Sequence, residues 1–270
     1  MLKIRAVLPL RACLALVLAL GLGGCHLGGP LLAMTQSTAR FTTCTPDARI
    51  LCEPGSEALA ARIAAELPAA LGSIEKAQFA RFAAPVRVLT YASADSFSTH
   101  SSASPGAAGV VIFGAAHISP VALRHADGVA KILAHELSHL QLAQQLGALS
   151  MSCLPAWFSE GLATWASNGG AAGQAYEPNV LVGIRHGQHF EPVEAQSLWK
   201  PYLVLPRRMA FPTYYSQTRL FVAFMHERDP DAFRVLLARL GRRDSFGDAV
   251  RAAYGRPVAG LWQEFVASIG

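Results

Sequence analysis

Residues 127–146 read DGVAKILAHELSHLQLAQQL, which contains the pattern H-E-x-x-H at His135, Glu136 and His139. The stretch predicts a helix, because its leucine and isoleucine residues form an apolar side. On a helix, the two histidines lie one turn apart on the same face and can bind one Zn²⁺. Glu136 lies beside them and can accept a proton from a water activated by the metal. The expected capping residues at the two ends are Asp127 and Gly147.

A second helix is expected from Pro155, since proline suits the first helical position, where no N–H is needed. This helix places Glu160 among apolar residues such as Trp157, Phe158 and Leu162. A buried carboxylate needs a partner, and a metal cation is one of the few adequate partners. Glu160 is therefore the expected third ligand. The alternative for Glu160 is an acid of the first turn that is stabilised by the helix dipole. The alternative for His135 and His139 is a pair of partly buried helix histidines that bind no metal.

The two stretches resemble the gluzincin zinc peptidases, in particular the short bacterial domains of the peptidase MA-like type. The resemblance covers about residues 85–268, and it depends on H-E-x-x-H followed by W-x-x-E-G-x-A at residues 157–163. It continues with Tyr-Ser-Gln-Thr at residues 215–218, where the family has a similar helix start. The metzincin alternative fails, because it requires a glycine and a histidine at the positions of Leu142 and Gln145.

The resemblance implies an α+β fold of the zincin-like class. A small antiparallel or mixed sheet is expected before the zinc-binding helix pair, and a mostly helical C-terminal lobe after it. The resemblance also implies a zinc-dependent metallopeptidase in which His135, His139 and Glu160 bind Zn²⁺. Glu136 is then the general base of peptide hydrolysis.

Two further positions bear on this interpretation. By resemblance, Tyr215 is expected to donate a hydrogen bond to the oxyanion of the transition state, and Tyr214 is the other candidate for this role. The alternative for either tyrosine is an aromatic residue of the core with no role in catalysis. Thr164 stands where many gluzincins have an aspartate that orients a ligand histidine. A threonine hydroxyl is a weaker partner for an imidazole than a carboxylate is.

The first 24 residues read as an export signal. Basic residues precede an apolar stretch at 12–22, which is too short to cross a bilayer, since crossing takes about 20 residues. Leu-Gly-Gly-Cys at 22–25 resembles a bacterial lipobox and predicts lipidation of Cys25. Because His26 follows, sorting to the outer membrane, facing the periplasm, is expected by analogy. The alternatives are an ordinary signal peptide or an anchor helix.

The basic character of the chain belongs mainly to this signal. Of 23 Lys and Arg and 18 Asp and Glu, three basic residues and no acidic residue lie in the signal, which leaves a charge of about +2. No basic cluster with interleaved aromatic residues is present, so nucleic-acid binding is not expected. The expected partners are a peptide or protein substrate and, through the lipid, a membrane. The sequence has no signal for an oligomeric state.

The cysteines indicate one short disulfide. Cys44 and Cys52 enclose a short segment and are expected to pair in an oxidising compartment. The alternatives are that Cys153 pairs with one of them or is free and buried. A role for Cys153 as a zinc ligand is not expected, because the ligand set is complete without it.

The mature chain is expected to consist of a tether at 25–55 and a zincin-like peptidase domain at 56–270. A strand is expected at 109–113. By resemblance, its residues 110–113 are a candidate wall of the substrate groove, where an extended peptide could add as a further strand; a purely structural strand is the alternative. The other expected elements are a helix at 56–67 that ends or kinks at Pro68, a strand at 85–91, loops at 93–106 and 168–212, and helices capped by Thr213, Asp229 and Ser245.

Two other functions fit the same residues. One is a non-catalytic, zinc-binding envelope lipoprotein; the other is a zinc hydrolase that acts on a non-peptide amide bond, for example in the cell wall. Glu136 is not a ligand, so its presence argues against a non-catalytic zinc protein. A fourth protein ligand would favour that function. A narrow pocket in place of an extended groove would favour the second.

Overall fold

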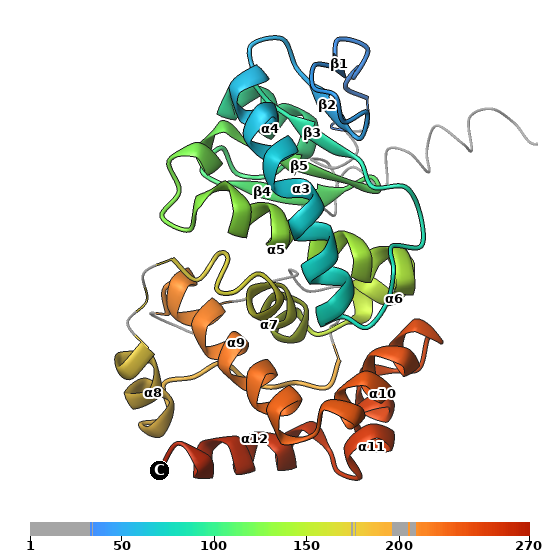
Figure 1. Ribbon diagram of the computed structural model, residues 1–270. Helices are drawn as coiled ribbons and strands as arrows, with labels where there is room; N and C mark the ends of the chain where they lie inside the picture. Colours follow the sequence, from blue (N-terminus) through green and yellow to red (C-terminus); the bar gives the residue numbers. More distant parts are fainter. Residues whose placement is uncertain (1–32, 34, 174, 176, 196–204, 206–208) are drawn as a thin grey trace, which may run out of the picture.

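The chain has a mixed α+β fold, with a five-stranded sheet in its N-terminal part and a helical C-terminal part (Figure 1). In this computed structural model the sheet precedes the helix of the H-E-x-x-H pattern, which confirms the expected fold class. Among the described residues, no helix combines the length and apolar character needed to cross a membrane. The expected export signal and Cys25 lie outside the described residues. The structure describes all residues except 1–32, 34, 174, 176, 196–204 and 206–208.

The sheet combines parallel and antiparallel strands in the order β1-β2-β3-β5-β4. β2, β3 and β5 are parallel neighbours, whereas β1 and β4 pair antiparallel at the two edges. β4 is thus an edge strand, and its outer backbone groups pair with no other described strand. The strands are β1 Thr42–Thr43, β2 Ile50–Cys52, β3 Val88–Thr90, β4 Gly109–Ile112 and β5 Ala115–Ile118.

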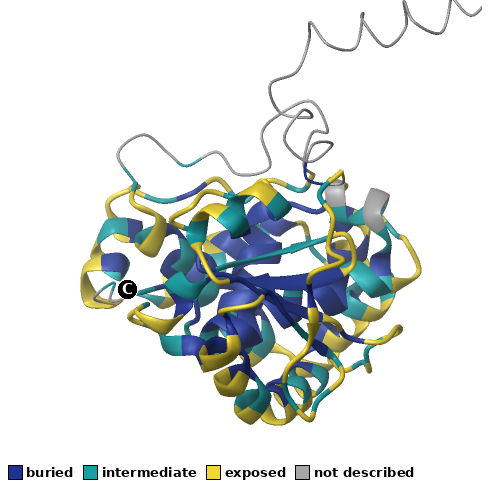
Figure 2. Cartoon of the chain, turned by 90° about the horizontal axis from the view of Figure 1, so that it is seen from above, coloured by how far each residue is buried: buried dark blue, intermediate teal, exposed yellow. Residues whose placement is uncertain are grey.

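Helices cover both faces of the sheet. α3 (Glu57–Ala77) and α5 (Gly128–Leu146) pack against one face, where aliphatic side chains such as Ile63 are fully buried. α4 (Ala94–Ser101) covers the other face with the fully buried ring of Phe97. Figure 2 shows the buried residues gathered on the strands and on the helix sides that face them. The H-E-x-x-H helix shares this core with the sheet from Val129 to Leu140.

The sequence predicts an end or a kink at Pro68, and the first of these is wrong, because α3 continues through Pro68 to Ala77. A proline inside a helix removes an N–H donor and costs about 3 kcal/mol. Ile63, Leu67 and Ile74, on both sides of this proline, are fully buried. Each such side chain contributes roughly 1.5–3 kcal/mol, so their burial outweighs the cost of the proline.

The C-terminal part is a group of helices around an aromatic core. The ring of Trp157 lies 5.7, 5.1 and 5.6 Å, between centroids, from the rings of Phe190, Phe221 and Phe246. Trp157 belongs to α7, which also packs against α5, so α7 joins this core to the H-E-x-x-H helix. The remaining helices are η1 Pro120–Leu123, α6 Ala148–Cys153, α7 Ala156–Ala166, α8 Glu177–Arg185, α9 Phe211–Arg228, α10 Pro230–Gly241, α11 Phe246–Tyr254 and α12 Val258–Ser268.

The expected helix boundaries are partly confirmed. The side chains of Asp229 and Ser245 accept hydrogen bonds from N–H groups in the first turns of α10 and α11, as expected of capping residues. α9 begins at Phe211, two residues before the expected Thr213. Asp127 precedes α5, but its carboxylate does not cap the helix and instead accepts from the N–H of a loop glycine, residue 173.

Several elements were not expected from the sequence, among them α4, α8 and β5. α4 lies in the expected loop at 93–106, α8 lies in the expected loop at 168–212, and β5 had no prediction. α4 is rich in serine and threonine, which are poor helix formers, but Ser93 caps it and Phe97 anchors it in the core. β5 is hydrogen-bonded on both sides and buried throughout, so it lacks the alternation that marks a half-buried strand.

The segment at 25–55 is more than a tether. β1 and β2 belong to the sheet, and Phe41 is buried against Tyr91. A disulfide joins Cys44 to Cys52, with 6.0 Å between the two Cα atoms, and confirms the expected pairing. The folded part of the chain therefore begins well before residue 56. Cys153 is free and exposed, not buried.

Candidate metal centre

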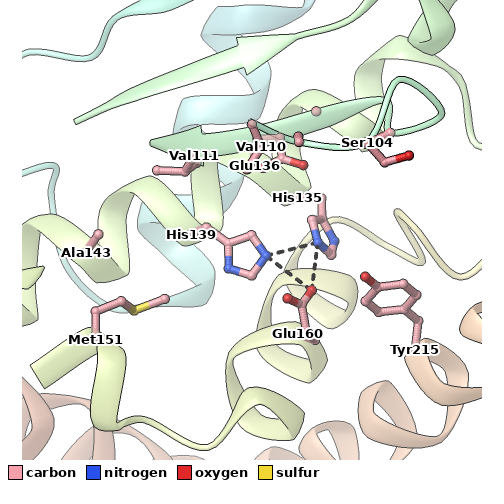
Figure 3. Close-up of a pocket in the computed structure, with 13 residues that line it drawn as sticks. Ser104, Val110, Val111, His135, Glu136, His139, Ala143, Met151, Glu160 and Tyr215 are labelled. Atoms are coloured by element: carbon pink, nitrogen blue, oxygen red, sulfur yellow. Dashed lines mark hydrogen bonds and ion pairs between the residues drawn. The ribbon is translucent and has the colours of Figure 1, made fainter. Parts of the chain in front are cut away.

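Three side chains from two helices meet with their ligand atoms together (Figure 3). The Nε2 atoms of His135 and His139 lie 3.1 Å apart, and each lies 3.3 Å from Oε2 of Glu160. The histidines come from α5 and the glutamate from α7. The cluster predicted from spacing along the sequence is thus formed in space, and it could hold a metal ion.

The geometry of the cluster fits a zinc ion. Imidazole and carboxylate ligands lie about 2.0–2.2 Å from Zn²⁺, so a tetrahedral site holds its ligand atoms roughly 3.3–3.6 Å apart. The observed separations of 3.1–3.3 Å are close to this spacing. Two imidazoles and one carboxylate also form a donor set that suits Zn²⁺. Among the described residues, the cluster has three protein ligands, which leaves a fourth position for water or substrate.

The charges of the cluster favour a cation. Burial raises the pKa of Glu160, but attraction and hydrogen bonds from His139 and His135 outweigh burial and hold this pKa well below its usual value. Burial lowers the pKa of His139, yet the negative charge of Glu160 outweighs burial and raises it. Glu160 is therefore ionised and attracts positive charge, which a divalent cation can supply in place of protons.

The other ring nitrogens of the two histidines also have partners. Nδ1 of His135 lies 3.1 Å from the carbonyl oxygen of Gly170, and Nδ1 of His139 lies 3.2 Å from the hydroxyl of Ser159. These contacts direct both Nε2 atoms toward Glu160. The hydroxyl of Thr164, which stands where many gluzincins have an orienting aspartate, orients neither histidine, because it is buried with no hydrogen-bond partner in the described part of the chain.

Glu136 lies beside the cluster without belonging to it. Its carboxylate is packed under β4, and a side chain at Gly109 would place a Cβ atom 2.8 Å from Glu136 Oε1. Burial raises the pKa of the Glu136 carboxyl group. A carboxylate in this position can accept a proton from a water near the three clustered side chains. Nothing in the sequence predicted that residue 109, which lies against the Glu136 carboxylate, must be a glycine.

A pocket of about 670 Å³ opens onto the cluster. β4 forms one wall with Val110 and Val111, whereas Ile112 and Phe113 of the expected wall do not line it. Figure 3 shows Val111, Ala143 and Met151 around His139, and Ser104 and Tyr215 toward the other end. The part near His139 is therefore apolar. Its lining residues are Ala103, Ser104, Ala107, Gly109, Val110, Val111, His135, Glu136, His139, Ala143, Met151, Glu160 and Tyr215.

The structure separates the two candidate tyrosines. Tyr215 lines the pocket, and its ring lies 6.0 Å from that of His135. The hydroxyl of Tyr215 points toward the cluster of His135, His139 and Glu160 in Figure 3. Tyr214 is buried in the aromatic core, 5.9 Å from the ring of Phe190, and does not line the pocket. Only Tyr215 is placed to contact a molecule in the pocket.

The comparisons with known proteins add no assignment. Models of protein families give no match to the chain, and a search of curated proteins gives none either.

Proposed function

We propose that the protein is a zinc-dependent metallopeptidase of the gluzincin type. The observation that supports this most strongly is Glu136, a buried carboxylate that is close to the three ligands and is not one of them. A site that only holds zinc for structure has four protein ligands and no need of this carboxylate. The edge strand β4 beside the cluster favours an extended peptide or protein substrate.

His135, His139 and Glu160 would hold Zn²⁺, which supplies a Lewis acid that polarises the scissile carbonyl and acidifies the attacking water. Glu136 accepts the proton of that water and then passes it to the leaving amine. The hydroxyl of Tyr215 donates a hydrogen bond to the oxygen on which negative charge develops. β4 orients the peptide backbone across these groups.

The substitution Glu136→Gln tests this function, because it retains the shape of the side chain and removes the base. Zinc content should be unchanged, whereas hydrolysis of a casein-type substrate should fall by about 10²–10⁴-fold. Glu57→Gln, an exposed change on α3, is the matched control and should leave both unchanged. If Glu136→Gln hydrolyses the substrate at the wild-type rate, the mechanism is wrong. If wild type binds zinc but cuts no peptide, the non-catalytic or non-peptide alternative is favoured.

We also propose that the enzyme is a lipid-anchored protein of the bacterial cell envelope, in the outer membrane and facing the periplasm. The support is the Leu-Gly-Gly-Cys sequence at 22–25 after an apolar stretch. Mass spectrometry of the mature N-terminus should find a lipidated Cys25, and Cys25→Ser should remove the lipid. An unmodified cysteine, or an intact segment 1–24 in the envelope, would contradict the anchor.

A further inference from the structure

The loop that follows α7, residues 167–173, lies against one of the metal-ligand histidines. The carbonyl oxygen of Gly170 is 3.1 Å from Nδ1 of His135, and both residues are buried. A carbonyl can only accept a hydrogen bond, so this contact requires the proton of His135 to be on Nδ1. We propose that Gly170 is a positioning residue, whose carbonyl selects the tautomer and orientation of His135 that leave Nε2 free to bind the metal. This proposal rests on the metal site of the proposed function, not on peptide hydrolysis.

Hydrogen bonds to α7 hold this carbonyl in place. The hydroxyl of Ser167 accepts from the N–H of Gly170 at 3.0 Å and donates to the carbonyl of Thr164 at 3.2 Å. The same Thr164 carbonyl accepts from the N–H of Gly169 at 2.8 Å. The loop is thus tied to the last turn of the helix that carries Glu160. α7 therefore carries the ligand Glu160 and also supports the loop that orients the ligand His135.

The far end of the loop is tied to α5. The N–H of Gly173 donates to the carboxylate of Asp127 at 3.1 Å, directly before the H-E-x-x-H helix begins. Between the two ties, Ala171 has a φ of 68°, a conformation that is strained for a residue with a Cβ atom. Backbone strain of this kind persists only where surrounding contacts determine the conformation. Here the contacts at both ends of the loop do so.

Residue 170 must be a glycine for the loop to approach α5 so closely. A Cβ atom at this position would lie 2.5 Å from the carbonyl oxygen of Lys131 and 2.6 Å from the hydroxyl of Ser167. Lys131 is four residues before His135, so it lies one turn away on α5. The close neighbour is backbone and cannot rotate away. Any larger residue at 170 must move the carbonyl away from His135.

The side chain of Thr164, which could have oriented His135 in place of the Gly170 carbonyl, does not do so. Thr164 is fully buried, and its hydroxyl has no hydrogen-bond partner among the described residues. Orientation of His135 therefore depends on the backbone of the loop and not on a side chain of α7. Partners of ligand histidines typically contribute 10–100-fold to metal affinity, so a change at Gly170 should be measurable.

The test compares the zinc affinity of full-length wild type, Gly170→Ala and Thr164→Val by competition with a chelating dye. Gly170→Ala should raise the Kd for Zn²⁺ by about 10–100-fold. Thr164→Val, which removes only an unpaired hydroxyl, should change the Kd by less than about twofold. Ser167→Ala is the second variant if Gly170→Ala does not fold, and it should weaken zinc binding by at least about threefold, because the N–H of Gly170 loses its acceptor.

A second measurement separates positioning from general destabilisation. In the zinc-loaded protein, ring ¹H–¹⁵N spectra report how fast the Nδ1 proton of His135 exchanges with solvent. Exchange should be faster in Gly170→Ala than in wild type, whereas the Nδ1 proton of His139, held by Ser159, should be unaffected. Equal Kd values for Gly170→Ala and wild type, or an equal loss in Thr164→Val, would overturn the proposal. Glu136→Gln tests hydrolysis without changing a ligand, so the two proposals can fail separately.

Discussion

The sheet region (residues 41–146) and the helical region (residues 154–269) are packed in different ways. The main core of the sheet region is aliphatic, whereas that of the helical region contains many aromatic rings, among them Trp157, Phe221 and Trp262. Branched aliphatic side chains fit the pleated surface of a sheet. In the helical region, aromatic rings pack against one another in stacked, tilted and edge-to-face pairs.

The cluster of His135, His139 and Glu160 lies where these two regions meet. The sheet region contributes both histidines and Glu136 through α5, and the helical region contributes Glu160 and Tyr215 through α7 and α9. Neither region holds a complete site. A bound metal would therefore link two regions that have separate cores, and the stability of each should respond differently to metal, acid and substitution.

Loss of a metal ligand from either region should have the largest effect. His139→Ala, from the sheet region, and Glu160→Ala, from the helical region, should both lose zinc and activity. At zinc concentrations 1,000 times the Kd, wild type should gain about 4 kcal/mol of stability over the chelator-treated protein, and neither variant should gain this. Metal analysis and thermal unfolding with zinc or chelator check the result. Zinc retained by Glu160→Ala would mean that the sheet region holds the metal without the helical region.

Sensitivity to acid should be concentrated in the sheet region. His117 is buried there, with Nδ1 2.6 Å from the hydroxyl of Tyr91, and burial lowers its pKa to about 4. As the pH falls below about 6.5, His117 takes up a proton in the unfolded chain but not in the folded one. The contribution of His117 to the free energy of unfolding of the metal-free protein should thus fall by about 3 kcal/mol between pH 6.5 and pH 4, and this contribution should level off below pH 4.

Urea unfolding across this pH range checks the acid prediction. The double change His117→Leu with Tyr91→Phe removes the titrating ring and its partner, and it should flatten the profile between pH 6.5 and pH 4. His186→Leu, an exposed histidine of the helical region, is the control and should leave the profile unchanged. A profile unaltered by the double change would place the acid sensitivity elsewhere in the molecule.

The smallest expected effect distinguishes two neighbouring tyrosines of the helical region. Tyr215→Phe should lower kcat by about 10²-fold with little change in KM, because its hydroxyl acts mainly in the transition state. Tyr214→Phe should have little effect on kcat, since Tyr214 lies in the aromatic core and not in the pocket. Steady-state kinetics with zinc content as the control check both. If only Tyr214→Phe lowers kcat, Tyr214 is the hydrogen-bond donor. If neither substitution lowers kcat, neither tyrosine stabilises the transition state.

Sequence by itself predicted the features that depend on short distances along the chain. The spacing of His135 and His139 determines that they share one face of a helix, whatever surrounds it. Glu160 stood out as a charge in an apolar helix, and Cys44 and Cys52 as a pair across a short loop. The capping residues of α10 and α11 were likewise predicted, because a cap bonds only within its own first turn.

Tertiary structure alone decided what depends on contacts between distant segments. α4 forms because Phe97 is buried against the sheet, and α3 continues through a proline because its apolar side is covered. Gly109 and Gly170 are glycines because a carboxylate lies against one and the backbone of α5 against the other. Nothing in the local sequence signals such close approaches, since a glycine has no side chain to show which segment will pack against it.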